Sequence, residues 1–236
     1  MATRYAHFCP AARALEKIGD KWSLLIVRDL LEGAQRFTDL IASLNNITPK
    51  WLTLRLRELE AAGIVERDSQ PGRREVWYRL TPAGRDLGPV LDALFFWGQR
   101  HAIRPPLPGE AVHVERMMKG LAKSLNSRGK RLSCPAVYSI QFPQGACLLS
   151  FNEGEWTSAP GEAPDAAIRI DTTAETMATF VTVPRDKRGE VFESMRVTGE
   201  PEQIREFRQI FGVLDVGENT NPKLEHEGER KNEQIV

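Results

Sequence analysis

The sequence predicts a protein of two domains, a mostly helical first domain and a second domain of the α+β class. Pro105, Pro106 and Pro108 stand close together, and such a proline-rich stretch ends a helix and favours an extended spacer. Before this spacer apolar residues recur mainly at helical spacing, whereas after it helical and alternating segments are mixed. We therefore expect domains over 1–103 and 110–214, a linker over 104–109 and a charged, disordered tail over 215–236.

Composition and charge are those of an ordinary globular protein, with 41% hydrophobic and 27% charged residues in a chain of 236. We expect a cytoplasmic protein without a membrane-spanning helix or a secretory signal, because long apolar runs are lacking. Residues 1–104 hold 16 Lys and Arg against 12 Asp and Glu, whereas residues 105–236 hold 16 against 20. The two halves are therefore expected to have different partners.

Local start and stop signals predict the elements of the first domain. Helices are expected over 10–18, from a cap at Asp20 to Leu31, over 37–44, and from the Thr48-Pro49 cap to Ala62. The second of these helices should bury one apolar face, which comprises Leu24, Leu25, Val27, Leu30 and Leu31. Two alternating strands follow over 64–69 and 75–80, and Thr81-Pro82 should open a long helix to about His101.

These elements together predict a winged helix-turn-helix, which consists of three helices, two strands joined by a basic turn, and a long closing helix. A helix of this kind fits the major groove of double-stranded DNA, and a basic hairpin can lie along the phosphates. The basic turn of the hairpin is formed by residues 70–74. The first domain is therefore expected to bind DNA.

The helix over 48–62 is the expected recognition helix, because Leu52, Leu56 and Leu59 form one stripe that should face the core. Near its N-terminus, Lys50, Thr53 and Leu54 are the candidates for contact with base edges, and Leu54 could make only apolar contact, for instance with a thymine methyl group. The candidates for phosphate contact are Arg36, Arg55, Arg57, Arg73 and Arg74, and the predicted DNA-binding set is completed by Thr48 and Trp51. The alternative is that the charged members are ordinary solvated residues.

Several short segments, met in order, resemble the HxlR family of bacterial transcriptional regulators over about residues 8–101. They are Cys9-Pro10-Ala11-Ala12-Arg13, Ile18-Gly19-Asp20-Lys21-Trp22, Arg36-Phe37, Ile47-Thr48-Pro49-Lys50, Leu52-Thr53, Arg55-Leu56-Arg57-Glu58-Leu59, Gly63-Ile64-Val65 and Tyr78-Arg79-Leu80-Thr81 with Gly84. The bulky Trp51 and Leu54 depart from the smaller or polar residues expected at their positions, so no operator sequence is predicted.

The resemblance implies a homodimer in which the first helix and the helix from Pro82 to His101 pack across a two-fold axis. The candidate dimer residues are Leu87, Val90, Leu91, Leu94, Phe95 and Trp97. The alternative is that these side chains pack against the second domain.

Cys9 precedes Pro10 at a helix N-terminus, a location that favours a thiolate. Some members of the resembling family sense oxidants or electrophiles through a cysteine at this place, so Cys9 is a redox candidate; alternatively it is a half-buried cap residue with no such role. Cys134 and Cys147 are expected to be small core residues. The spacing of the cysteines and histidines predicts neither a metal site nor a cofactor.

In the second domain, a helix is expected over 112–125, followed by strands with alternating faces. The expected inward residues of these strands are Tyr138, Ile140 and Phe142, then Cys147, Leu149 and Phe151, then Ala166, Ile168 and Ile170. Asn152-Glu153-Gly154 predicts a hairpin, and Thr172 with Glu175 predicts a capping box. A less regular helical stretch, a strand over 195–199 and a helix from Pro201 should complete the domain.

Residues 110–213 are similar to the sterol carrier protein (type 2) domain. The similarity lies in Asp165-Ala166-Ala167-Ile168-Arg169-Ile170 before a helix and in Val197-Thr198-Gly199-Glu200-Pro201-Glu202 before Phe207. It implies a sheet covered by helices around an apolar tunnel, whose candidate wall residues are Met117, Met118, Leu121, Phe142, Trp156, Met177, Phe180, Phe207 and Phe211. Such a stripe can also be plain core, and the domain can instead be a dimerisation module.

The sequence therefore predicts a homodimeric DNA-binding regulator that responds to a hydrophobic small molecule and is not an enzyme. The alternatives are a thiol-based sensor and a lipid carrier or enzyme with an accessory DNA-binding module. Against an enzyme, the sequence contains no evident nucleophile–base pair, phosphate loop or metal-ligand set.

Overall fold

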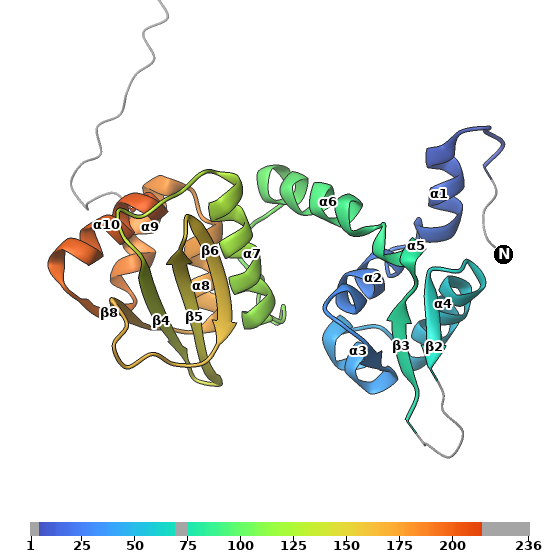
Figure 1. Cartoon of the computed structure of the whole chain (residues 1–236), viewed down its shortest axis with the longest axis horizontal. Helices are drawn as coiled ribbons and strands as arrows, with labels where there is room; N and C mark the ends of the chain where they lie inside the picture. The colour runs from blue at the N-terminus through green and yellow to red at the C-terminus, as the bar shows by residue number, and fades with distance from the viewer. Residues whose placement is uncertain (1–4, 69–74, 214–236) are drawn as a thin grey trace, which may run out of the picture. The chain divides into compact units, whose positions relative to one another are not determined.

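The computed structural model describes residues 5–68 and 75–213, and the chain divides into two compact units, Met1–Ile103 and Arg104–Val236 (Figure 1). Each unit has its own hydrophobic core. The predicted disordered tail and the tip of the predicted wing lie outside the described residues. No helix in the described part of the chain is long and apolar enough to cross a membrane.

The first unit contains six helices and a small antiparallel sheet in its described residues. The elements are α1 (Pro10–Ile18), α2 (Ser23–Leu31), β1 (Gln35–Arg36), α3 (Phe37–Leu44), α4 (Pro49–Ala61), β2 (Val65–Asp68), β3 (Trp77–Leu80), α5 (Pro82–Arg85) and α6 (Gly88–His101). The sheet order is β1-β3-β2. The predicted winged helix-turn-helix is thus confirmed, with β1 as an additional short strand that the sequence pattern does not indicate.

Side-chain caps fix the ends of these elements as their sequence predicts. The Thr48 hydroxyl oxygen accepts a hydrogen bond from the Trp51 N–H at 3.3 Å, and Pro49 follows at the first helical position. The Thr81 hydroxyl accepts from the Gly84 N–H at 3.1 Å and donates to the Gly63 carbonyl at 2.6 Å. Thr81 therefore both starts α5 and ties it to the end of α4.

The second helix ends at Leu31 as predicted, but its start and its buried face differ from the prediction. α2 begins at Ser23, and the Asp20 carboxylate accepts hydrogen bonds from the N–H groups of Trp22 and Ser23 in the turn before it. Leu31 is 41% exposed, whereas Ile26, absent from the predicted apolar face, is fully buried. The core therefore contacts α2 on a face rotated slightly from the predicted one.

The prediction of one long helix from Pro82 to His101 is wrong. α5 ends at Arg85, two turn residues follow, and α6 begins at Gly88. Pro89 causes the break, because a proline lacks an N–H donor and its ring would clash with the carbonyl of Arg85, four residues earlier.

The described residues of the second unit form a five-stranded mixed sheet with four helices. The elements are α7 (Val114–Ser127), β4 (Ala136–Phe142), β5 (Gly145–Asn152), β6 (Glu155–Pro160), β7 (Ile168–Asp171), α8 (Ala174–Thr182), α9 (Arg185–Glu193), β8 (Arg196–Gly199) and α10 (Pro201–Phe211). The sheet order is β6-β5-β4-β7-β8, with β4 and β7 parallel and the other pairs antiparallel. All four helices contribute side chains to one core cluster, to which residues of the sheet also belong. The α+β class is confirmed.

Turn chemistry in this unit follows the sequence closely, with two corrections. Glu153 and Gly154 both have positive φ (51° and 82°), as a two-residue hairpin between β5 and β6 requires. The cap of α8 is Thr173, whose hydroxyl accepts from the Thr176 N–H at 3.1 Å; the predicted cap Thr172 lies one residue earlier. Ala166 lies before β7, so only the other two predicted inward residues belong to that strand.

Candidate nucleic-acid interface

The helix-turn-helix consists of α3, a sharp turn and α4. Asn45 and Asn46 form the turn with positive φ values of 36° and 58°, a conformation that asparagine tolerates better than most residues. Upstream, the Ser43 hydroxyl of α3 donates a hydrogen bond of 2.5 Å to the buried Asp29 carboxylate of α2. The Ser43–Asp29 hydrogen bond therefore joins α3 to α2 just before the turn that leads to α4.

α4 presents one face to the core and the opposite face to solvent, as its sequence predicts. Leu52, Leu56 and Leu59 are at most 2% exposed. The exposed residues on the other side include Lys50, Trp51 (49%), Leu54 (41%) and Arg57. Neither Lys50 nor Arg57 forms an ion pair with another residue that the structure describes. Exposed basic and apolar side chains therefore share the outer surface of this helix.

Two of the candidate DNA-binding residues on α4 use their hydroxyl groups within the helix. Thr48 caps the helix N-terminus, and the Thr53 hydroxyl donates to the Pro49 carbonyl at 2.8 Å. The position of Thr53 is half-buried. These hydroxyls have a defined structural role whether or not DNA is bound.

Arg55 lies in an intramolecular network. Its Nε is 3.3 Å from the Asp20 carboxylate, it also pairs with Glu58, and its guanidinium carbon lies 5.6 Å from the Trp51 ring centroid. The Arg55 side chain is only 22% exposed. Arg55, which is predicted to contact a phosphate, therefore also contacts the ring of Trp51.

Arg36 lies beside the two-stranded ribbon. Its Nε donates to Asp39 at 3.0 Å, it pairs with Glu75 at 3.4 Å, and its guanidinium carbon is 5.5 Å from the Trp77 ring. The hydrogen bond and the charge of Asp39 raise the pKa of Arg36, and the same contact lowers the pKa of Asp39. Trp77, which is 36% exposed, is a surface residue that the predicted set lacks.

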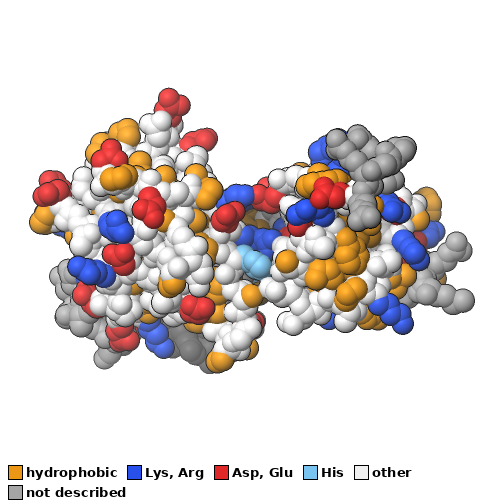
Figure 2. Space-filling model, turned by 90° about the horizontal axis from the view of Figure 1, so that it is seen from below, with side chains coloured by type: hydrophobic (Ala, Val, Ile, Leu, Met, Phe, Trp, Pro, Cys, Tyr) orange, Lys and Arg blue, Asp and Glu red, His pale blue; other side chains and the backbone are white. Residues whose placement is uncertain are grey.

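The remaining wing candidates, Arg73 and Arg74, lie outside the described residues. The strands that lead to them are joined by an ion pair of 2.8 Å between Arg79 and Glu66. On the face displayed in Figure 2, hydrophobic side chains of the first unit are interspersed with Lys and Arg.

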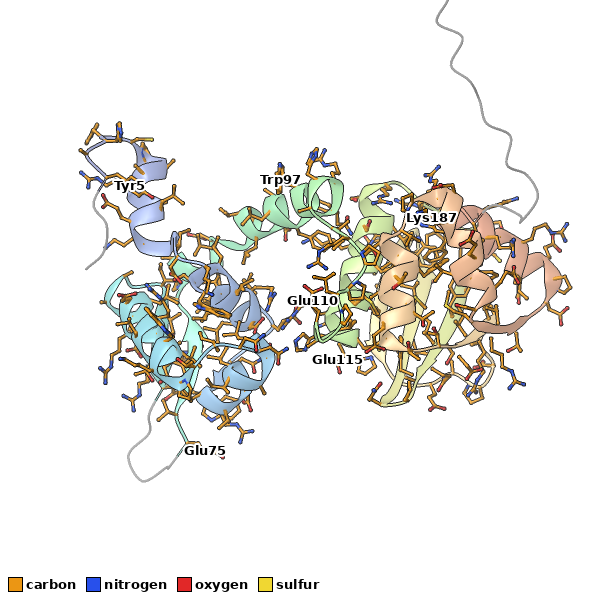
Figure 3. All side chains as sticks on the ribbon, turned by 180° about the vertical axis from the view of Figure 1, so that it is seen from behind. Tyr5, Glu75, Trp97, Glu110, Glu115 and Lys187 are labelled. Atoms are coloured by element: carbon orange, nitrogen blue, oxygen red, sulfur yellow. The ribbon has the colours of Figure 1, made fainter. Side chains whose placement is uncertain are left out.

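The candidate dimer residues lie on α6 or at its cap, Leu87, and fall into three groups. Val90, Leu94 and Trp97 are 43%, 47% and 56% exposed, and Figure 3 shows Trp97 on this helix. Leu87 and Leu91 instead pack against the core of their own unit. Phe95 is half-buried and packs edge-to-face on Phe96 at 5.2 Å. None of the fourteen residues of α6 is buried. From residue 5 to the end of α1, the exposed large hydrophobic residues are Tyr5, Phe8 and Leu15.

Cys9 is exposed and occupies the cap position of α1, where its side chain makes no capping hydrogen bond. The segment before it is held against α1, because the Tyr5 N–H donates to the Glu16 side chain at 2.9 Å. Cys147 is buried as predicted, and burial raises the pKa of its thiol. Cys134 is exposed, so the prediction of a core role for it is wrong; it precedes β4 and does not share the inward face of that strand.

The candidate ligand-binding residues of the second unit belong to or line one core cluster. Seven are buried, and Met117 and Leu121 are half-buried against the same cluster. Phe207 stacks on Phe211 with ring centroids 4.2 Å apart and on Phe180 at 6.3 Å. Two residues outside the predicted ligand-binding set, Tyr138 and Phe192, lie 5.4 and 5.7 Å from Phe207. The arrangement is a closely packed aromatic core.

A family model described as HxlR-like helix-turn-helix matches residues 17–105. An HTH-type transcriptional regulator of Synechocystis sp. is 42% identical over 89 residues, which make up 37% of this chain and 66% of that protein. One from Methanothermobacter thermautotrophicus is 35% identical over 105 residues (44% and 80%), and YvaP of Bacillus subtilis is 37% identical over 94 residues (39% and 87%). The match thus covers just under two thirds of the length of the first relative and a larger share of the length of the other two.

Among solved structures, the redox regulator HypR in its oxidized form is 36% identical, with coverage of 40% of this chain and 99% of that chain and a TM-score of 0.38. The reduced transcriptional regulator YodB from B. subtilis is 32% identical, with coverage of 44% and 100% and a TM-score of 0.37. These matches cover less than half of the chain.

Proposed function

Because the chain belongs to the HxlR-like helix-turn-helix family through its first unit, we propose that it is a DNA-binding transcriptional regulator of the cytoplasm. The observation that carries the proposal is the orientation of α4, whose buried leucine stripe leaves Lys50 and Arg57 on the outer face. In this proposal α4 enters the major groove of double-stranded DNA and the ribbon of β2 and β3 lies along the adjacent phosphates. Arg36, Arg73 and Arg74 supply the phosphate contacts near the ribbon.

The regulator acts as a homodimer through α1 and α6. Support comes from the exposure of Val90, Leu94 and Trp97 on α6, because large apolar side chains gathered on one helix favour a protein partner. Leu87 and Leu91 pack on the core of the first unit and so hold α6 against it. Two copies then present two recognition helices to a two-fold symmetric operator.

The second unit binds a hydrophobic small molecule and modulates DNA binding, and it is a sterol-carrier-like domain without enzymatic activity. The cluster of aromatic and methionine side chains supports this role, since such side chains adapt to apolar ligands. Binding requires that Met117 and Leu121, which are half-buried, move relative to the aromatic rings to open a pocket. In the described residues, no group of three or more His, Cys, Asp or Glu could hold a metal ion.

A second candidate mode of control is oxidation of Cys9. The observation that favours it is the exposure of this thiol at the start of α1, on a helix of the proposed dimer surface. Modification at this position would change the contact between the two copies, and with it the spacing of the recognition helices.

The proposal is tested by selecting duplexes from a random double-stranded library with the full-length protein, followed by footprinting of the enriched sequence. The expected result is a two-fold symmetric protected site, on a duplex whose migration in a gel is retarded by one bound dimer. Lys50→Ala should change the sequence preference. Enrichment of no sequence above the starting library, with binding independent of sequence, would contradict a role as a specific regulator.

A further inference from the structure

We propose that α4 reads the C5-methyl groups of pyrimidine bases in the major groove, through a hydrophobic contact formed by Trp51 and Leu54. This inference rests on the proposed function and adds to it the chemical feature by which the operator is recognised. The surface that makes this contact is the exposed apolar part of α4.

Apart from Lys50, the polar DNA-binding candidates in the first two turns of α4 form hydrogen bonds or ion pairs within the protein. The Thr53 hydroxyl donates its proton to the Pro49 carbonyl at 2.8 Å, and the Thr48 hydroxyl oxygen accepts from the Trp51 N–H. Arg55 is held by Asp20 and Glu58. Of the residues in the first two turns, only Lys50 keeps a polar group directed outward without a partner among the described residues.

Trp51 and Leu54 occupy the outer face of these two turns. They are three residues apart and therefore lie side by side on the helix surface, 49% and 41% exposed. Apolar side chains cannot read the donor and acceptor pattern of a base edge. The apolar group that a base presents in the major groove is the C5-methyl group of thymine, and 5-methylcytosine carries the same group at the same position.

The Trp51 ring is held in place before DNA binds. The Arg55 guanidinium lies 5.6 Å from the ring centroid, a distance at which a cation is attracted to the ring face, and Asp20 lies 3.3 Å from Arg55 Nε. The turn before α2 thus positions an arginine, and the arginine positions the indole. A preorganised apolar surface loses less conformational entropy on binding than a free side chain does.

The alternative occupant of this surface is another protein. Two observations favour DNA. Lys50 and Arg57 are also exposed and flank the apolar pair along the helix. The pair belongs to the second helix of a helix-turn-helix, whose N-terminal residues face the groove. A protein-binding role for the pair is an outcome that the experiment below would reveal.

The test uses the full-length protein and a duplex enriched by it from a random library. Each thymine of the duplex is replaced in turn by deoxyuridine, which removes only the methyl group and leaves the hydrogen-bonding edge intact. At one or more positions in each half-site we expect the Kd of the wild type to rise about fourfold for each contacted methyl group that is removed. Leu54→Ala and Trp51→Ala should bind the two duplexes with nearly equal affinity at those positions.

The matched control is Leu31→Ala. Leu31 has the same 41% exposure as Leu54 but lies on α2, so this variant should keep the full penalty for deoxyuridine. The source of the methyl group is distinguished by placing cytosine or 5-methylcytosine at the sensitive position. Recovery of affinity with 5-methylcytosine shows that the methyl group alone is read, whereas a deoxyuridine penalty without recovery assigns the contact to thymine.

Specific binding that is unaffected by deoxyuridine at every position would overturn methyl readout and leave the regulator proposal intact. A deoxyuridine penalty that persists in both Trp51→Ala and Leu54→Ala would also overturn it, because the methyl contact would then belong to another residue. If no duplex is enriched, the proposed function fails and this inference fails with it.

Discussion

Asn126 and Trp156 form a reciprocal hydrogen-bonded pair in which one side chain satisfies both backbone groups of a strand residue. The Asn126 amide donates to the Trp156 carbonyl at 2.8 Å, and the Trp156 N–H donates to the Asn126 side-chain oxygen at 2.8 Å. The indole N–H of Trp156 donates in turn to the Lys130 carbonyl at 2.8 Å. The end of α7 is thereby fastened to β6, a strand at the edge of the sheet.

Replacing Asn126 by alanine should destabilise the second unit. Two backbone groups of Trp156 would lose their partners, and a buried group left unpaired costs roughly 1–3 kcal/mol. Chemical denaturation of the full chain, combined with hydrogen exchange over residues 114–160, measures the change and its location. Glu155→Gln is the control, since Glu155 is exposed and adjacent in the same strand. Unaltered exchange in Asn126→Ala would show that the pair contributes nothing to stability.

Glu110 should remain ionised to unusually low pH. Arg104 donates to both of its carboxylate oxygens (2.8 and 2.7 Å) and the Leu107 N–H to one (2.7 Å), which together lower its pKa from 4.5 to about 2. Because the pKa is lowered in the folded state, the stabilisation is present above about pH 4.5 and is lost as the pH falls toward 2.

NMR titration measures the pKa of the Glu110 carboxyl group, and hydrogen exchange at the Leu107 amide reports its hydrogen bond to Glu110. Glu110→Gln should speed exchange at Leu107, because an uncharged amide oxygen is a weaker acceptor than a carboxylate. A carboxyl titration near pH 4.5 in the wild type would contradict the ion pair in solution.

Much of the fold follows from local chemistry. Thr48-Pro49 and Thr81-Pro82 start helices because a capping hydroxyl and a proline act on their own backbone, whatever the rest of the chain does. The leucine stripe of α4 and the hairpin at Glu153-Gly154 are likewise short-range patterns. Pro89, which causes the break before α6, is visible in the sequence, but the apolar repeat on both sides of it favours a single helix.

The environment of the candidate site could not be predicted in the same way. Asp20 and Arg55 meet only after α1, α2 and α4 have packed, so their ion pair leaves no trace in local spacing. The same holds for Arg36, which sequence alone marks as a phosphate contact but which lies between Asp39, Glu75 and Trp77. Exposure of Cys134 also depends on where its strand begins and not on the residue type.

The wing should contribute affinity without sequence preference. Arg73→Ala combined with Arg74→Ala is expected to weaken binding to all duplexes alike and to lower the slope of log K against log salt by roughly 0.9 for each phosphate that the variant no longer neutralises. Fluorescence anisotropy at several salt concentrations measures both effects. Arg131→Ala combined with Arg205→Ala removes the same charge from exposed positions of the second unit and should leave the slope unchanged. Equal slopes for wild type and wing variant would remove the wing from the interface.

Oxidation at Cys9 can be separated from oxidation elsewhere because the chain offers a second exposed thiol. Cys9→Ser should bind DNA like the wild type under reducing conditions and should resist release by a peroxide or by diamide. Cys134→Ser, also at an exposed position, should respond as the wild type does. If all three proteins are released alike, the Cys9 switch is excluded.

The last prediction concerns the surface by which two copies meet. Leu94 is 47% exposed on α6, and in the proposed dimer its side chain is covered by the partner. Leu94→Glu should therefore raise the dimer dissociation constant by about tenfold or more, since covering an unpaired carboxylate costs more than the roughly 1.4 kcal/mol that corresponds to a factor of ten. The domain itself should stay folded, because Leu94 is outside its core cluster.

Analytical ultracentrifugation gives the dissociation constant of the dimer, and circular dichroism checks the fold. The matched control is Leu107→Glu, which changes a 54% exposed leucine of the linker. DNA affinity should fall together with dimerisation, because a monomer places only one recognition helix on a two-part site. A Leu94→Glu variant that remains as dimeric as the control would place the interface elsewhere on the chain.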